Sequence, residues 1–124
     1  MSNLQLSLTK KWFDLTKAGI KTEDYREITP YFAKRFLRYN DKKMSTSFWA
    51  SLLIGKEFFE MFFDDISFEK FDSNIMTLGY PKSTDSERIL ELEHKGIEIR
   101  EGNPDWGAIP GRKYFVILHG SFLK

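Results

Sequence analysis

The hydrophobic pattern of residues 9–27 predicts a short helix followed by a polar strand. Apolar positions recur near helical spacing after a possible cap at Thr9, and Gly19 supplies a stop: Trp12, Leu15 and Ala18. From residue 22 to 27 the pattern changes to a period of two, as in a strand. Neither face of that strand is apolar, so packing against a hydrophobic core does not explain why these residues would form a strand.

Two further helices are predicted in the next third of the chain. Thr29-Pro30 opens one over residues 30–39, because proline is tolerated in the first turn of a helix. Residues 48–65 are rich in phenylalanine and predict a third helix, capped by Ser45, Thr46 or Ser47. Its buried stripe is Phe48, Leu52, Phe59, Phe62 and Phe63. Trp49 and Phe58 lie on the opposite face, which would become a self-association surface if it were left uncovered.

The last third of the chain predicts strands and turns. Residues 74–78 form a short strand, and residues 88–99 alternate well, with Gly96 marking a bulge or bend. Residues 102–111 are too rich in glycine and proline for regular structure, and a final strand covers residues 113–119.

Length and composition favour one folded domain. The chain has 124 residues, 41% of them hydrophobic, which is enough for a single core. It has no cysteine and no secretory signal pattern, and no uncharged apolar run approaches the roughly 20 residues that cross a bilayer. We therefore expect a cytoplasmic protein without a membrane partner.

The charges are unevenly distributed. The net charge is +1, but residues 1–43 carry ten Lys or Arg against five Asp or Glu, and residues 44–124 carry nine against thirteen. A basic region attracts phosphate locally, because electrostatic fields act over a Debye length of about 10 Å. Lys34, Arg35 and Arg38 of the second predicted helix would contribute to it. The alternative is an ordinary solvated surface.

The stretch GIKTEDYRE, residues 19–27, resembles the G-x-K-x-x-E-x-R signature of ASCH domains of the PUA-like superfamily, with Asp24 in place of the usual Glu. The segments LSLTKKWFDLTKAGIK, YREITPYFAKR and KGIEIREGNPDWGAIPGRKYFVI are similar to the bacterial and phage branch. The resemblance implies an α+β fold over residues 1–124: a small mixed β-barrel of about five to six strands with helices packed at its ends. Residues 44–66 would be a variable helical segment.

The resemblance also implies a charged cleft beside the signature strand, which would explain why that strand lacks an apolar face. Lys21 and Arg26 are suited to hold phosphate, Asp24 to orient Lys21, and Tyr25 to stack on a base. The distant loop would add an acid and an indole, Asp105 and Trp106. The alternative is a structural ion-pair network of Lys21, Asp24, Arg26 and Asp105 that fixes the loop to the barrel.

Three functions follow from these residues. The preferred one is binding of RNA or a modified nucleotide through Lys21, Tyr25, Arg26 and Trp106, as the resemblance implies. The second is a small amidohydrolase acting on acylated cytidine, with Lys21, Asp24 and Asp105 as catalytic residues. In that case Thr22 is a possible nucleophile, or a carboxylate activates water and Asp105 or Glu101 carries the proton. The third is a protein-interaction adaptor that uses the Phe-rich helix.

No cofactor is expected, and the protein should be a monomer or a weak homodimer. The two histidines, His94 and His119, are too few and too far apart in the sequence for a metal site. Each is interpreted as a strand histidine with a polar partner.

Overall fold

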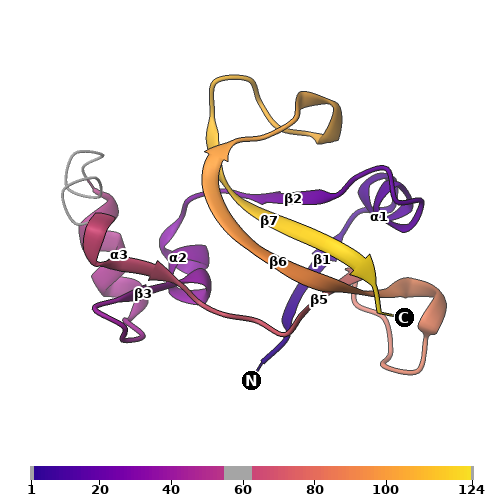
Figure 1. Ribbon diagram of the computed structural model, residues 1–124, viewed down its shortest axis with the longest axis horizontal. Coiled ribbons are helices and arrows are strands. Elements are labelled where there is room, and N and C mark those ends of the chain that lie inside the picture. The colour runs from indigo at the N-terminus through magenta and orange to yellow at the C-terminus, as the bar shows by residue number, and fades with distance from the viewer. Residues whose placement is uncertain (1, 55–62, 124) are drawn as a thin grey trace. The chain divides into compact units, whose positions relative to one another are not determined.

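The computed structural model describes residues 2–54 and 63–123, and the chain divides into two compact units (Figure 1). We call Met1–Tyr25 with Lys70–Lys124 the sheet unit, and Arg26–Glu69 the helical unit. The sheet unit therefore combines the first and last parts of the chain. It contains most of the signature stretch and the whole of the distant loop.

The sheet unit is built on a curled five-stranded mixed sheet that forms a half-barrel (Figure 1). Its order is β1-β5-β6-β7-β2. The strands are β1 (Leu4–Leu8), β2 (Glu23–Arg26), β5 (Ser73–Leu78), β6 (Ile89–Glu101) and β7 (Lys113–Phe122). β1 runs parallel to β5, and the pairs β5–β6 and β6–β7 are antiparallel. The α+β prediction is confirmed at this level.

Alternating burial explains why the first half of β6 is a strand. Leu90 and Leu92 are buried while Glu91 between them is half-buried, as the predicted alternation requires. Gly96 has a φ of 122°, and the register with β7 shifts on either side of His94. The predicted irregularity at Gly96 is confirmed, and it lies in the long curved strand β6 (Figure 1).

α1 (Lys10–Lys17) connects β1 to the signature stretch. It buries Phe13 and Thr16, and Thr9 occupies the N-cap position without a side-chain capping bond. The helix ends at Lys17 with Ala18 as its C-cap, and Gly19 follows with a φ of 75°, in the left-handed region that glycine adopts easily. The amide of Lys21 then donates to the carbonyl of Leu15 at 3.1 Å, which fixes the start of the signature stretch against the helix end.

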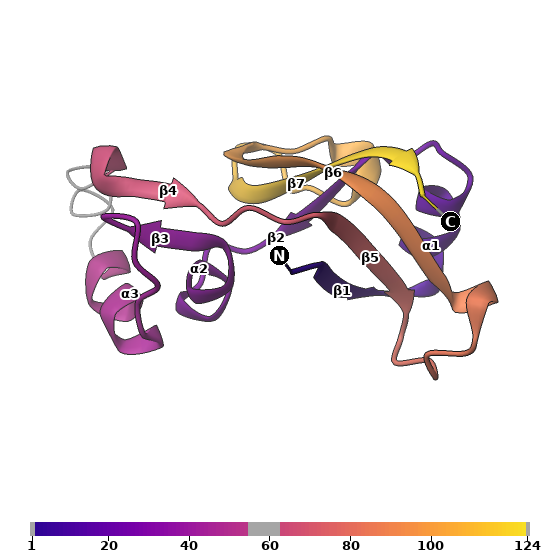
Figure 2. The ribbon, with the colours of Figure 1, turned by 60° about the horizontal axis from the view of Figure 1, so that its bottom comes forward.

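In the helical unit, the predicted second helix is shorter than expected. α2 covers Pro30–Phe36, with Thr29 as its N-cap, and β3 (Leu37–Tyr39) follows at once. β3 pairs with β4 (Ile66–Phe68) in a two-stranded antiparallel sheet (Figure 2). The Leu37 amide still donates to the carbonyl of Ala33 in α2, but the backbone of Leu37 is extended and pairs with Phe68. Its side chain is fully buried, so strand pairing and burial outweigh the helical pattern. Arg38 is therefore a strand residue.

The third predicted helix begins where expected, and it buries Leu52 of the predicted stripe together with Trp49. α3 covers Thr46–Leu53, and the Ser45 hydroxyl accepts from the amide of Phe48 at 3.2 Å. Trp49 and Leu52 are its buried residues, and Phe48 is half-buried. Trp49, predicted on the face opposite the buried stripe, is fully buried, so the condition for a self-association surface at this residue is not met. The remaining stripe residues Phe59 and Phe62, and also Phe58, lie outside the described residues, and Phe63 begins a short 3-10 turn, Phe63–Asp65.

Other elements follow the sequence less closely. β1 was not predicted, because its five residues LQLSL become a strand only through parallel pairing with β5. Two short 3-10 turns, Ser86–Arg88 and Pro104–Trp106, occupy segments predicted as loops. Among the described residues, no helix is long and apolar enough to cross a membrane.

Gly107 offers a test of how the loop 102–111 is held. Its φ is 95°, and a Cβ added there would lie 2.8 Å from Cζ2 of Trp12. We expect Gly107→Ala to lower the free energy of unfolding by about 2 kcal/mol, since backbone strain adds to displacement of the indole. The matched control is Gly111→Ala, with a φ of 83° and no neighbour within 4 Å, which should cost only about 1 kcal/mol. Urea unfolding measures both, and equal losses would show that the loop does not pack on Trp12.

Candidate functional site

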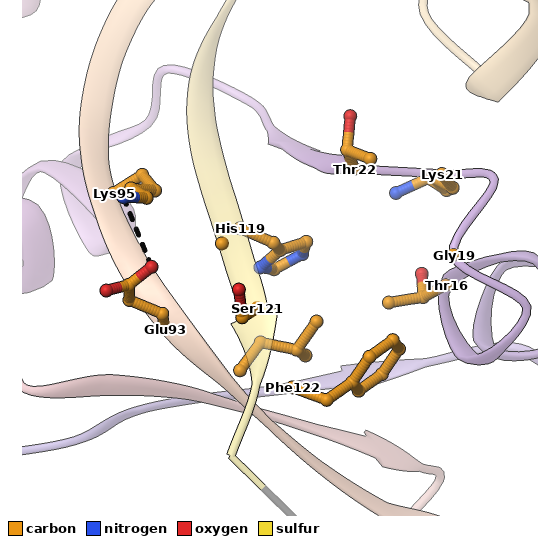
Figure 3. Close-up of a pocket in the computed structure, with 11 residues that line it drawn as sticks. Thr16, Gly19, Lys21, Thr22, Glu93, Lys95, His119, Ser121 and Phe122 are labelled. Atoms are coloured by element: carbon orange, nitrogen blue, oxygen red, sulfur yellow. Dashed lines mark ion pairs between the residues drawn. The ribbon is translucent and has the colours of Figure 1, made fainter.

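A pocket of about 390 Å³ opens in the sheet unit beside the signature stretch (Figure 3). Its walls come from the end of α1, the turn before β2, and the neighbouring strands β6 and β7. The lining residues on the α1 side are Thr16, Gly19, Lys21 and Thr22, and those on the strands are Leu92, Glu93, Lys95, His119, Gly120, Ser121 and Phe122. The pocket therefore combines hydroxyls, charges and an imidazole with a few apolar side chains.

The backbone places the signature stretch beside β7. After the turn at Gly19, the carbonyl of Thr22 accepts from the amide of His119 at 3.0 Å. This bond places Thr22, with Lys21 before it in the chain, next to His119 on the pocket wall. Glu93 and Lys95 lie on the β6 side and form an ion pair at 3.2 Å (Figure 3).

Lys21 and Asp24 form a buried ion pair. The Lys21 ammonium donates to Asp24 Oδ1 at 3.2 Å and to the carbonyl of Glu23 at 2.5 Å. The two side chains are only 2% and 6% exposed. A buried ion pair of this kind is costly to break, because either partner alone would be a poorly compensated charge in a low-dielectric interior.

Two aromatic rings flank the Lys21 ammonium. Its Nζ lies 5.9 Å from the ring centroid of Trp12 and 5.6 Å from that of Tyr25. Both distances are within the range at which a ring face attracts a cation. Lys21 is therefore a positioned cation at the base of the pocket, and its contacts differ from those expected of a mobile side chain that reaches out to phosphate.

The signature strand also holds the distant loop. The Tyr25 hydroxyl donates to Glu23 Oε1 at 2.7 Å and accepts from the amide of Asn103 at 2.8 Å. Arg100 donates to Glu23 Oε2 at 2.5 Å. Burial raises the pKa of Tyr25 to about 12. Burial opposes ionisation of Glu23, but the hydrogen bonds from Arg100 and Tyr25 outweigh it and lower the pKa of that carboxyl. Glu23 thus stays charged and the loop stays attached to β2.

The predicted site residues are only partly assembled around this pocket. Lys21 lines it, whereas Asp24 pairs with Lys21 and Tyr25 contacts the loop. Asp105 is exposed and Trp106 is half-buried in the turn after Asn103, and neither belongs to the described residues that line the pocket.

Arg26 belongs to the helical unit. Its guanidinium carbon lies 5.9 Å from the ring centroid of Phe32 on α2. Of the ion-pair network that was the structural alternative, the structure shows the Lys21–Asp24 pair. The loop is held to β2 by a separate set of contacts that involve Glu23, Tyr25 and Arg100. Glu23 and Arg100 were not among the predicted site residues.

Sequence reasoning missed a cluster of polar side chains beneath the pocket. Asn74 on β5 is fully buried, and its amide contacts His94 on β6 and His119 on β7. The interpretation of each histidine as a strand residue with a polar partner is confirmed. The available signal was a polar residue at a position of β5 where the alternation calls for an apolar one.

Comparisons of the chain with protein-family models, with curated proteins and with solved structures find no match.

Proposed function

We propose that this protein binds single-stranded RNA or a free nucleotide by taking one unstacked base into the pocket of the sheet unit. The observation that carries this proposal is the pocket: about 390 Å³, next to the signature stretch, with Lys21, Thr22 and His119 on its walls. A volume of this order is typical of small-ligand sites. RNA-binding proteins commonly receive splayed bases in such pockets.

The chemistry of the walls suits a nucleotide. Leu92 and Phe122 offer apolar surface to the face of a base, and the hydroxyl of Ser121 can bond its polar edge. The Thr16 hydroxyl already donates to the carbonyl of Trp12 at 2.7 Å and can only accept from a ligand. Lys95 supplies a cation for phosphate, since its side chain is 58% exposed although Glu93 lies close to it. The buried Lys21 contributes positive charge from beneath.

The proposal includes membership of the ASCH domains in the PUA-like superfamily. Support comes from the signature residues Gly19, Lys21 and Arg26, and from the position of Gly19 and Lys21 on the pocket wall. The curled mixed sheet with helices is compatible with a small PUA-like barrel. In this proposal the polar residues of the signature stretch have two roles: some line the ligand pocket, and others hold the loop of residues 102–111.

The binding experiment uses end-labelled single-stranded RNA of mixed sequence, with fluorescence anisotropy measured at low and high salt. We expect binding that weakens as salt rises, because phosphate contacts release counterions. Competition by unlabelled nucleotides should show whether one base is enough. Absence of both RNA and nucleotide binding at low salt would reject the proposal.

Lys95 is the pocket cation that can be removed with least damage to the fold. We expect Lys95→Ala to weaken RNA binding about threefold to tenfold and to reduce the salt slope by about 1, as loss of one phosphate contact should. Lys113→Ala is the matched control, since Lys113 is an exposed lysine at the other end of β7. Equal effects of the two variants would mean that the RNA does not approach this pocket.

One observation favours the amidohydrolase as a second candidate. Thr22 lines the same pocket as Lys21, while Asp24 does not line it and is engaged with Lys21. A hydroxyl nucleophile is thus better placed than a carboxylate-activated water. The test is hydrolysis of acylated cytidine by the wild type and by Thr22→Val. Turnover that the variant abolishes, without stable RNA binding, would favour this function over the first.

A further inference from the structure

We propose that His119 is the specificity-determining hydrogen-bond donor of the pocket, and that it selects a base presenting an uncharged acceptor, a carbonyl oxygen or an unprotonated ring nitrogen. Asn74 is the positioning residue that fixes the required tautomer. This inference rests on the proposed nucleotide-binding function and specifies which chemical feature of the base is recognised.

The orientation of the Asn74 amide is determined by its neighbours. Its Nδ2 lies 3.2 Å from the carbonyl oxygen of Leu118, which can only accept a hydrogen bond. The nitrogen of the amide must therefore face β7, and the oxygen must face β6. Rotating the amide by 180° would place two oxygens against each other.

This orientation fixes the tautomer of His119. Asn74 Nδ2 lies 2.8 Å from His119 Nδ1, so Nδ1 must accept and the proton of the neutral ring must be on Nε2. Protonation of Nδ1 would bring two donors together. Burial also lowers the pKa of His119, to about 4, so the ring stays neutral around pH 7.

The same amide orients His94. Asn74 Oδ1 lies 2.6 Å from His94 Nδ1, which must donate. Both hydrogens and the oxygen of the Asn74 amide are thus engaged, by Leu118, His119 and His94. The Asn74 side chain is fully buried and held by three hydrogen bonds. It is therefore a rigid support for the imidazole of His119 on β7.

The other nitrogen of His119 has unused bonding capacity. Nε2 is buried and has no hydrogen-bond partner among the residues that the structure describes. A buried donor left without an acceptor costs free energy, and an acceptor on a bound ligand would recover it. His119 lines the pocket, but its Nε2 is closed off from solvent, so a base that enters the pocket reaches this nitrogen when the side chains around it move on binding. Groups that can only donate, such as an ammonium, would be rejected.

The first experiment measures binding of uridine 5′-monophosphate, which carries two carbonyl acceptors, by isothermal titration calorimetry. Ribose 5-phosphate is the probe without a base, and we expect it to bind at least about tenfold more weakly. His119→Phe removes the donor and should weaken binding of the nucleotide at least about tenfold. His119→Gln keeps an amide donor near the Nε2 position and should stay within about threefold of the wild type.

The second experiment reads the tautomer directly, by ¹⁵N NMR of the histidine rings in the full chain. The wild type should show a proton on Nε2 and none on Nδ1 of His119 at pH 7. In Asn74→Asp a carboxylate can only accept, so His119 Nδ1 should become protonated. A merely structural role of Asn74 would change stability without this change in the spectrum.

The outcomes separate this inference from the proposed function. If the wild type binds the nucleotide and His119→Phe binds it equally well, the inference is overturned and nucleotide binding stands. A wild-type His119 that carries its proton on Nδ1 also overturns it. If the wild type binds neither RNA nor the nucleotide, the proposed function fails and the inference fails with it.

Discussion

Replacing Lys21 with methionine should lower the free energy of unfolding by about 3 kcal/mol, because removal of one member of a buried ion pair leaves the other charge poorly compensated. Methionine fills the space of the lysine stem but cannot donate to Asp24 Oδ1 or to the carbonyl of Glu23. The Asp24 side chain is only 6% exposed, so water cannot replace the lost ammonium. Urea unfolding of the wild type and the variant measures the loss.

Two further variants show whether the loss comes from the buried charge. Lys10→Met removes an ion pair with Asp14 that is 2.6 Å long but lies on the surface, and it should change stability by no more than about 0.5 kcal/mol. Lys21→Met combined with Asp24→Asn should recover a substantial part of the loss, because it removes the uncompensated charge. A single Lys21→Met variant as stable as Lys10→Met would contradict the role given to the pair.

The result also bears on how Lys21 is to be tested for function. A variant that unfolds more easily can lose RNA binding without any contact to RNA. Lys95 and His119 are therefore better probes of the pocket, since Lys95 is exposed and His119→Gln conserves a donor. Binding by Lys21→Met should be interpreted only at temperatures where its fold is intact.

The sequence predicted the sheet unit well where the residue pattern is local. β6 follows from alternation, β5 and the start of β7 lie where short strands were predicted between turns, and the irregularity at Gly96 follows from glycine in a strand. The end of α1 follows from Gly19. These features depend on neighbouring residues in the chain, so their signals survive in a single sequence.

Features decided by distant partners were missed. Leu37–Tyr39 continues a helical pattern but becomes β3 by pairing with Ile66–Phe68. Trp49 and not Phe48 is buried in α3, because the covering surface and not the spacing alone selects the buried face.

In the candidate site, too, the residues marked by a local sequence pattern were predicted and those brought together by distant strands were not. The signature stretch correctly drew attention to Lys21, whereas His119 and Asn74 were not predicted as site residues. Strand β5 and strand β7 are separated by about one third of the chain, and the Asn74 amide contacts His119 only because β6 brings those strands together. No spacing in the sequence encodes that contact.

Acidification should destabilise the protein between pH 6.5 and pH 4, and His119 should account for about 3 kcal/mol of that loss. Burial lowers the pKa of His119 from 6.5 to about 4 in the folded state, while the charges of Asp24 and Glu23 oppose this shift and those of Lys21 and His94 favour it. Below pH 6.5 the unfolded chain therefore binds a proton that the folded chain does not, and stability falls as pH falls. Above pH 6.5 this contribution is fully present.

His119→Gln isolates this effect because glutamine does not titrate. Burial lowers the pKa of His94 as well, so some pH dependence of the same sign should remain in the variant. Urea unfolding at pH 7, 6 and 5 avoids most of the carboxylate titration, and there the wild type should lose stability more steeply than the variant, by up to about 1.4 kcal/mol per pH unit. Parallel pH profiles would mean that His119 is charged equally easily in the folded and unfolded chains. The imidazole would then not be held neutral by its burial, and a single Nε2–H tautomer could not serve as the fixed donor of the pocket.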